Sequence, residues 1–314
     1  MCEAFLAQGV RAWRGNAKAW SGKFDEQLGS FGIDKDVLIG IQGDASGSVY
    51  VKSSNGWLDR TYEDELRSYK VAGQQDVDLI HTALKFRGIE LVAWSRKNGV
   101  VCVQTNLFEN DGDDHTNVSG VGVIRLHADG RVSYGLEGHN RCPLGYGPTL
   151  ADGVPRSARE WLDLTQTTAF PYAIVRLLQC LTVPGLAPDM IVTTQEGFDL
   201  SKDWEYFILN FAGGHGGINP THLRTPAIFS GDGVVSSGQI LGTATAEDVG
   251  ASLHKLLGAI GPGELPSLNF LESRMAGDVI AEAYWMGSNN GTSGSYAQEL
   301  LQGTPLSCIT GGGD

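Results

Sequence analysis

The sequence predicts a three-layer α/β domain, in which a central β-sheet lies between two layers of helices. Three observations support this fold class. Short β-rich runs alternate with helical stretches along the chain. The run MIVTT at Met190–Thr194 is apolar on both alternations, which is typical of a strand covered on both faces. No Gly-, Ser- or Pro-rich linker divides the 314 residues, so we expect one domain.

The expected strands are rich in Val, Ile, Tyr and Phe and are bounded by Gly, Pro or Asn. They are Val37–Gln42, Ser48–Lys52, Glu90–Trp94, Val100–Gln104, Gly122–His127, Met190–Thr194, Tyr206–Asn210 and Ala227–Ser230.

The first expected helix is an amphipathic segment at the N-terminus. The last has the clearest end signals, because Thr245 is a favourable N-cap, Asp248 lies in the first turn and Gly258 ends the apolar stripe. After the N-terminal segment, the expected helices are Tyr62–Tyr69, Asp76–Phe86, Ser157–Leu164, Pro171–Thr182 and Glu247–Leu257.

The single domain is expected to cover residues 1–314. Within it we expect a helical N-terminal segment over 1–35, a core over 37–270 and a C-terminal extension over 271–314. The weakest seam in the core is the Gly- and Pro-rich stretch Leu144–Pro155.

The charge balance excludes whole classes of partner. Lys and Arg number 23 and Asp and Glu number 36, which gives a net charge of −13 and a pI of about 4.9. An acidic chain is repelled by phosphate backbones and by anionic lipid. We therefore expect binding neither to nucleic acid nor to a membrane surface.

The cysteines and the hydropathy indicate the compartment. Five cysteines lie far apart without a CxxC pair, which argues against a zinc knuckle, a thioredoxin-type motif and a disulfide scaffold. The N-terminus lacks the apolar core of a signal peptide, and no apolar window approaches the ~20 residues of a membrane span. We expect a cytoplasmic protein.

Common phosphate-binding and nucleophile motifs are missing. The glycines of GIQGDASGSV do not form a GxGxxG or P-loop pattern, and Asp44 in this stretch has the chemistry of a turn residue. No GxSxG elbow occurs, and Ser230 has no feature of an activated nucleophile. Asp111, Asp113 and Asp114 lack the alternating oxygens of an EF-hand and fit a solvated hairpin loop better than a cation site.

The histidine of GGHGG, His215, has two glycines on each side. Glycines permit close backbone approach, and a free imidazole nitrogen can reach a metal or an anion. His222 follows seven residues later. The alternative is a loop that needs positive φ angles, with His215 bonded to backbone, because two loop histidines are a weak zinc signal.

Four segments in order carry a family resemblance. They are TTQEGF at 193–198, GGHGG at 213–217, TPAIFSGDGV at 225–234 and TAEDVGASLHKLLG at 245–258. Their order resembles the C-terminal half of the alkaline phosphatase superfamily, especially type I phosphodiesterases/nucleotide pyrophosphatases and sulfatases. In that family the corresponding motifs are TSDHG, a histidine-glycine loop, VPLIFxGPGV and TxxDVxPTLLxLLG. With weaker upstream segments the resemblance spans residues 37–270.

The resemblance implies a mixed, mostly parallel central sheet, truncated on its N-terminal side, and a two-metal site for phosphoryl or sulfuryl transfer. The metal ligands that it implies here are His215, His139 and Glu196. The family's aspartate–histidine pair falls on Gln195 and Glu196, and Gly135 stands where an aspartate of the DxxxH motif is expected.

The family's nucleophile and first aspartate have no counterpart, because they belong to an N-terminal half that is larger than the chain before the matching region. The first hypothesis is therefore a divergent member without autonomous hydrolysis that binds a ligand or a partner chain, or is half of a two-chain enzyme. The second is a metal-dependent phosphodiester, phosphomonoester or sulfate ester hydrolase that uses His139, His215 and Glu196. The third is an unrelated α/β protein.

The first hypothesis implies no metal cofactor, and the second implies zinc or manganese at His215, His139 and Glu196. The expected partners are a partner chain, a second copy of the chain or a small anionic ligand. In any open α/β sheet, ligands bind near the carboxyl ends of strands, so the turns after Met190–Thr194 and Tyr206–Asn210 are the places to examine.

Overall fold

The computed structural model describes part of the chain. The described residues are 1–15, 35–43, 45–57, 59–71, 73, 75–106, 119–138, 141–183, 187–200, 215–226, 228, 243–246 and 248–249. Contacts divide the chain into two units, Met1–Arg224 and Thr225–Asp314. Most of the second unit lies outside the described residues, so the expectation of a single domain over 1–314 stays a prediction.

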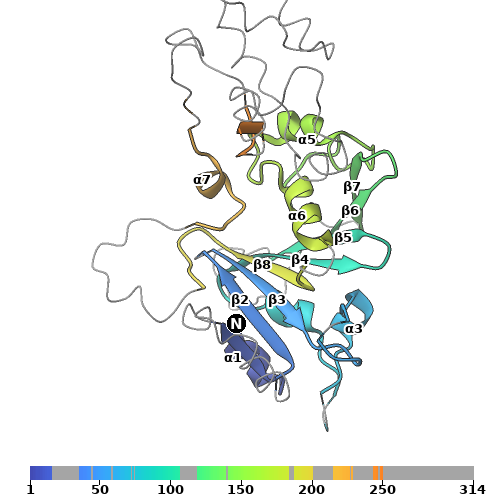
Figure 1. Ribbon diagram of the computed structural model, residues 1–314, viewed down its shortest axis with the longest axis vertical. Helices are drawn as coiled ribbons and strands as arrows, with labels where there is room; N and C mark the ends of the chain where they lie inside the picture. Colours follow the sequence, from blue (N-terminus) through green and yellow to red (C-terminus); the bar gives the residue numbers. More distant parts are fainter. Residues whose placement is uncertain are drawn as a thin grey trace, which may run out of the picture. The chain divides into compact units, whose positions relative to one another are not determined.

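The first unit is built on one eight-stranded sheet with the order β1-β2-β3-β8-β4-β5-β6-β7. The last of the described strands, β8, lies between β3 and β4 (Figure 1). The strands are β1 (Ala12–Gly15), β2 (Val37–Gln42), β3 (Ser46–Val51), β4 (Ile89–Arg96), β5 (Val100–Thr105), β6 (Val121–Leu126), β7 (Val132–Glu137) and β8 (Met190–Thr194).

The expectation of a mixed, mostly parallel sheet in a three-layer α/β/α fold is wrong. Strands β2 to β8 pair antiparallel throughout. Among the described strands, the single parallel pair is β1–β2, which adds a short strand at one edge. The alkaline-phosphatase-like α/β architecture that the sequence motifs imply is therefore not the architecture of this sheet.

Short connections explain the antiparallel pairing. A parallel neighbour needs a crossover of a dozen or more residues, whereas a hairpin turns within a few. The β4–β5 turn at 97–99 contains Asn98 and Gly99 with φ angles of 64° and 69°, the positive φ values that tight hairpin turns use. The β6–β7 turn contains the pair Asp129–Gly130, with Gly130 at φ 80°. These two dipeptides are hairpin signals that the alternation of strands and helices concealed.

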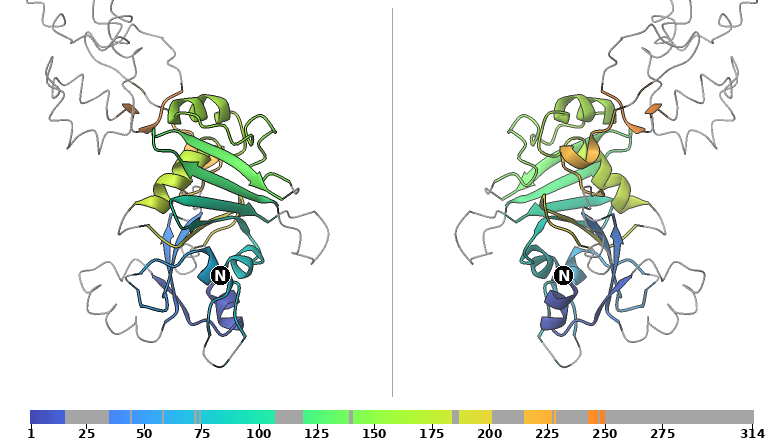
Figure 2. Two further views of the ribbon diagram at one scale, coloured as in Figure 1. Left: turned by 90° about the vertical axis from the view of Figure 1, so that its right-hand side faces the viewer. Right: turned by 90° about the vertical axis from the view of Figure 1, so that its left-hand side faces the viewer.

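Short helices pack against both faces of the sheet (Figures 1 and 2). Helices α1, α3 and α4 lie on one face, and α5 and α6 lie on the other. The bounds are α1 (Cys2–Ala7), α3 (Glu63–Arg67), α4 (Leu79–Leu84), α5 (Ala158–Thr165), α6 (Ala173–Thr182) and α7 (Pro220–Leu223). None of the described helices has the length and apolarity needed to cross a membrane.

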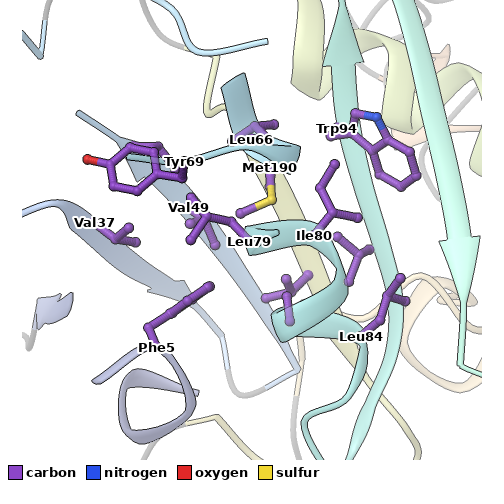
Figure 3. Packing of buried hydrophobic residues seen from close by; sticks show 14 of the residues in the cluster. Phe5, Val37, Val49, Leu66, Tyr69, Leu79, Ile80, Leu84, Trp94 and Met190 are labelled. Atoms are coloured by element: carbon purple, nitrogen blue, oxygen red, sulfur yellow. The ribbon is translucent and has the colours of Figure 1, made fainter. Parts of the chain in front are cut away.

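Each face of the sheet has its own hydrophobic core, and β4 contributes to both. Its residues alternate: Val92 and Trp94 lie in the core under α1, α3 and α4, and Leu91 and Ala93 lie in the core under α5 and α6. Figure 3 shows the first core, where Trp94 and Met190 pack near Ile80 of α4. All four of these β4 side chains are fully buried.

Element positions agree with the sequence more closely than their pairing does. Two expected strands, Val37–Gln42 and Met190–Thr194, are present with the expected bounds, and four further strands and the four expected helices between residues 62 and 182 are present with shifted ends. Strand β7 was missed, and the expected N-terminal helix ends at Ala7 and is followed by β1. The expected strands at 206–210 and 227–230 fall on residues that are wholly or mostly outside the described ones.

In the second unit, the start of the expected helix at Thr245 is confirmed. The Asp248 N–H donates to Thr245 Oγ1 at 3.2 Å, and the Thr245 N–H donates to Asp248 Oδ2 at 2.7 Å. These reciprocal bonds satisfy amide groups that the first turn of a helix leaves without partners.

The position of β4 at the centre of the sheet predicts that alanine substitution destabilises the protein much more at one leucine, Leu91, than at another, Leu126. Leu91→Ala, at a fully buried position, should lower the free energy of unfolding by about 2–5 kcal/mol because it leaves a cavity between strands and helices. Leu126→Ala, on β6 with a side chain 55% exposed, should cost less than about 1 kcal/mol. Urea denaturation of both variants measures this, and equal losses would contradict the arrangement.

Candidate functional site

The strongest candidate site lies at the end of the sheet where β8 terminates. Because neighbouring strands are antiparallel, the carboxyl ends of β8, β5 and β2 lie beside the amino ends of β4 and β3. This arrangement gathers polar side chains from distant parts of the sequence. We call Glu90, Asn106, Glu196 and His215 the sheet-end site.

Ala45, in the β2–β3 connection, holds two segments together at this end. Its N–H donates to the His215 carbonyl oxygen at 3.1 Å, and its carbonyl accepts from the Thr194 N–H at 3.0 Å. The GGHGG segment and the end of β8 are thus bonded to the same residue. His215 and Glu196, which the sequence motifs paired as metal ligands, therefore belong to neighbouring segments.

Gly43 makes the approach of His215 feasible. Its φ angle is +62°, and a Cβ atom there would lie 2.4 Å from His215 Nδ1 and 2.5 Å from the His215 carbonyl oxygen. No side chain fits in that space, so glycine is required both by conformation and by contact. The imidazole is exposed and rests against this glycine.

The turn after β8 brings Glu196 to the amino end of β4. The Gln195 N–H donates to the Gly88 carbonyl oxygen at 2.8 Å, and the Phe198 ring covers Gly88. The Thr194 hydroxyl donates to the Phe198 carbonyl oxygen at 2.8 Å and closes the turn. Glu196 lies in this turn with an exposed side chain.

Glu90 is the most perturbed group of the site. It stands at a β-bulge, where the β4–β8 register shifts between Ile89 and Leu91. Burial, and next the charge of Glu196, raise the pKa of Glu90 from 4.5 to about 7. Bulges often redirect side chains next to functional sites, and a carboxyl that titrates near neutrality is a candidate for binding or proton transfer.

Asn106 completes the site from β5. Its N–H donates to the Glu90 carbonyl oxygen at 3.1 Å, one step beyond the Leu91–Thr105 pair. Its side-chain Nδ2 donates to the Leu84 carbonyl oxygen at 2.6 Å at the end of α4. Within the described residues, Asn106 Oδ1 is buried and has no hydrogen-bond partner.

The expected metal set of His215, His139 and Glu196 is not assembled by the residues that the structure describes. His139 lies outside them. Gly138, the residue before it, directly follows β7, which is four strands from β8, or ~19 Å at a strand spacing of ~4.8 Å. Among the described residues, no group of three or more His, Cys, Asp or Glu is placed to hold a metal. The set stays a prediction.

The other candidate residues from the sequence either have a structural role or lie outside the described residues. His222 Nδ1 accepts the Gly217 N–H at 3.0 Å, so this ring supports its loop, and its neutral form carries the proton on Nε2. Gly135 pairs with Val123 inside the β6–β7 hairpin. Asp44 and the acidic stretch at 110–117 lie outside the described residues.

A second buried carboxylate, Asp189, is structural. It precedes β8 at the opposite end of the sheet and accepts the N–H groups of Val51 at 2.7 Å and Thr61 at 2.9 Å. Burial raises the pKa of Asp189 to about 6, against the opposing effect of these two bonds and of the Arg60 charge. The Arg60 guanidinium donates to Ser95, Leu181 and Pro188, so both charges are engaged in the interior.

Sequence reasoning missed Glu90 and Asn106 because each ends or begins an ordinary strand. The one available signal was position: both are polar residues at the ends of apolar strands that pair with each other. The bulge that singles out Glu90 is a product of pairing with β8, whose residues Thr193 and Thr194 lie more than 100 positions further along the chain than Leu91 and Ile89, with which they pair.

Comparisons with protein-family models, with curated proteins and with solved structures give no match to this chain. They neither support nor oppose the resemblance of the sequence motifs, which remains a prediction.

Replacing Glu90 should change how stability depends on pH. Because the pKa of Glu90 is raised to about 7, the folded state binds more protons than the unfolded state between pH 4.5 and 7, and stability falls as the pH rises through that range. In Glu90→Gln, the free energy of unfolding should fall by about 1–2 kcal/mol less over this pH range than in the wild type. This figure is smaller than the pKa shift alone gives, because the carboxyl is partly exposed to solvent.

Chemical denaturation between pH 4 and 8, in the presence of a chelator, measures the effect. Asp163→Asn, which removes an exposed carboxylate on α5, is the control and should leave the pH profile unchanged. A Glu90→Gln profile that parallels the wild type would contradict the perturbed state of Glu90.

Filling Gly43 should displace the His215 segment. Gly43→Ala introduces both backbone strain and a clash with His215, whereas Gly73→Ala, at φ +76° with open space around it, introduces strain alone. We expect Gly43→Ala to destabilise by about 1–3 kcal/mol more than Gly73→Ala. Hydrogen exchange should show increased exchange at residues 215–218 and at Ala45 in the first variant only, and identical behaviour of the two would refute the contact.

Proposed function

We propose that the chain is a ligand-binding protein without autonomous ester hydrolysis, and that its ligand binds at the sheet-end site. The observation that carries this proposal is the pair formed by Glu90 and Glu196, in which a carboxyl at a β-bulge is held beside a second carboxylate. Maintaining two like charges together is unfavourable for folding, and such arrangements concentrate at functional sites.

The neighbouring hydroxyls support binding over hydrolysis. The Thr194 hydroxyl donates to the Phe198 carbonyl oxygen, and the Ser119 hydroxyl donates to the Gly120 carbonyl oxygen at 2.7 Å. At the same end, Thr105 Oγ1 and Thr193 Oγ1 are buried without a hydrogen-bond partner within the described residues, so none of these four hydroxyls is bonded to a base. A nucleophilic hydroxyl would instead need a bond to a base, which activates it for attack.

The charge of the site favours a cationic ligand. The expected small anionic ligand would meet the carboxyl groups of Glu90 and Glu196, and burial together with the charge of Glu196 already raises the pKa of Glu90. A cation relieves that repulsion, and an anion adds to it. A partner chain or a second copy of the protein remains a prediction, on which the described residues give no observation.

A metal-dependent hydrolase of phosphodiesters, phosphomonoesters or sulfate esters is the second candidate. It is favoured by one observation, the two bonds of Ala45 that connect the His215 segment to the end of β8. In this alternative, His215 and Glu196 bind zinc or manganese with His139 as the third ligand, and the metal activates a water molecule.

We also propose a cytoplasmic location. It is supported by the cysteines of the described residues, Cys2, Cys102, Cys142 and Cys180, which are free thiols. Free thiols are typical of a reducing compartment.

Hydrolysis assays with His215→Ala distinguish the two candidates. Purified full-length protein with added Zn²⁺ or Mn²⁺ should show no turnover of phosphodiester, phosphomonoester or sulfate ester substrates above the rate of the variant. Metal-dependent turnover that falls by at least about 100-fold in His215→Ala would instead establish the hydrolase, because removal of a metal ligand eliminates the activated water. Asn219→Ala, in the same segment, controls for general disturbance of the loop.

A further inference from the structure

The unpartnered oxygen of Asn106 has no explanation in the fold. Asn106 is only 5% exposed, and its Nδ2 is bonded to the Leu84 carbonyl oxygen. Its Oδ1 has no hydrogen-bond partner among the described residues. A buried amide oxygen without a partner is costly, so an unpaired one indicates a water molecule, an ion or a ligand at that position.

Strand pairing places Asn106 next to Glu90. The bond from the Asn106 N–H to the Glu90 carbonyl oxygen continues the β4–β5 ladder beyond Leu91–Thr105. Residues directly opposite each other in an antiparallel pair project their side chains from the same face, with Cβ atoms ~5 Å apart. This face is the one that α4 covers, because Asn106 also reaches Leu84.

Glu196 approaches the same position from β8. The bond from Gln195 to Gly88 fixes the turn two residues before Glu90, and the Phe198 ring packs over Gly88. Three residues with oxygen-bearing side chains, from β4, the end of β5 and the turn after β8, therefore lie at the same end of the sheet. Among the described residues, Arg87 is the basic residue nearest in sequence to Glu90, and its side chain is exposed.

We propose that Glu90, Glu196 and Asn106 Oδ1 bind a hard divalent cation of the Mg²⁺, Ca²⁺ or Mn²⁺ class. This inference rests on the proposed ligand-binding function and names its ligand. The cation neutralises the two carboxylates and supplies the partner that Asn106 Oδ1 lacks.

The ligand set selects this class of cation. All three groups present oxygen, and hard cations prefer carboxylate and amide oxygens, whereas zinc and copper favour nitrogen and sulfur. Two carboxylates with one amide oxygen leave the other coordination positions to water, as is common for Mg²⁺ and Mn²⁺. This ligand set differs from the set of His139, His215 and Glu196, because the two sets have only Glu196 in common and this one contains no histidine.

Calorimetric titration of the full-length protein with Mg²⁺, Ca²⁺ or Mn²⁺ alone tests the proposal. At pH 7.5 we expect one cation per chain, with affinity reduced about tenfold or more in Glu90→Gln and in Glu196→Gln, because each change removes a charged ligand. Asp163→Asn removes an equal charge on α5 and should bind as the wild type does. Circular dichroism verifies that each variant is folded.

Two outcomes overturn the cation site. One is the absence of binding for all three metals, and the other is binding that Glu90→Gln and Glu196→Gln leave intact. Spermidine, an organic cation, is titrated in parallel. This titration distinguishes a wrong assignment of the metal from a wrong assignment of the ligand-binding function. If spermidine alone binds and both glutamine variants lose it, the metal assignment is wrong and the ligand-binding function stands.

Discussion

The backbone bonds that β8 forms on both of its sides hold the first unit together. β8 pairs with β3 through Met190–Thr193 and with β4 through Met190–Thr194. Without it, the β2–β3 hairpin and the β4–β7 meander would be separate sheets with open edges. Asp189, at the start of this strand, fixes its position by accepting the N–H groups of Val51 and Thr61. A buried carboxylate with such bonds is costly to misplace, which makes the register of β8 specific.

The same strand assembles the candidate site at its other end. Beyond Thr194, the chain bonds to Ala45 on one side and to Gly88 on the other. The bulge at Glu90 arises because β4 contains one more residue than β8 can pair. The positions of the polar groups in the sheet-end site are thus consequences of how β8 fits between its neighbours.

The sequence predicts the elements of this fold well, because apolar alternation is a local property. Met190–Thr194 reads as a buried strand whatever its neighbours are, and the Ser157 capping box marks the start of α5. Pairing is not local. The parallel arrangement was expected from segment order and from family motifs, whereas the turn at Asn98–Gly99 required a hairpin. Turn residues were therefore better guides to topology than the resemblance.

The candidate site was predicted only in part, for the same reason. Glu196 and His215 stood out because of their local motifs, and both lie at the end of β8. Glu90 and Asn106 have no local motif, and their meeting is fixed by the β4–β5 ladder and by the bulge opposite β8. His222, equally prominent in the sequence, uses its ring to support a loop.

The central place of β8 also has a consequence for synthesis of the chain. Residues 1–137 contain seven of the eight strands, yet the edges of β3 and β4 that face β8 stay unpaired until residues 190–194 have been made. Exposed strand edges pair readily with other chains. A nascent chain that pauses before β8 is therefore at greatest risk of aggregation, and chaperones that shield strand edges should matter most in that interval.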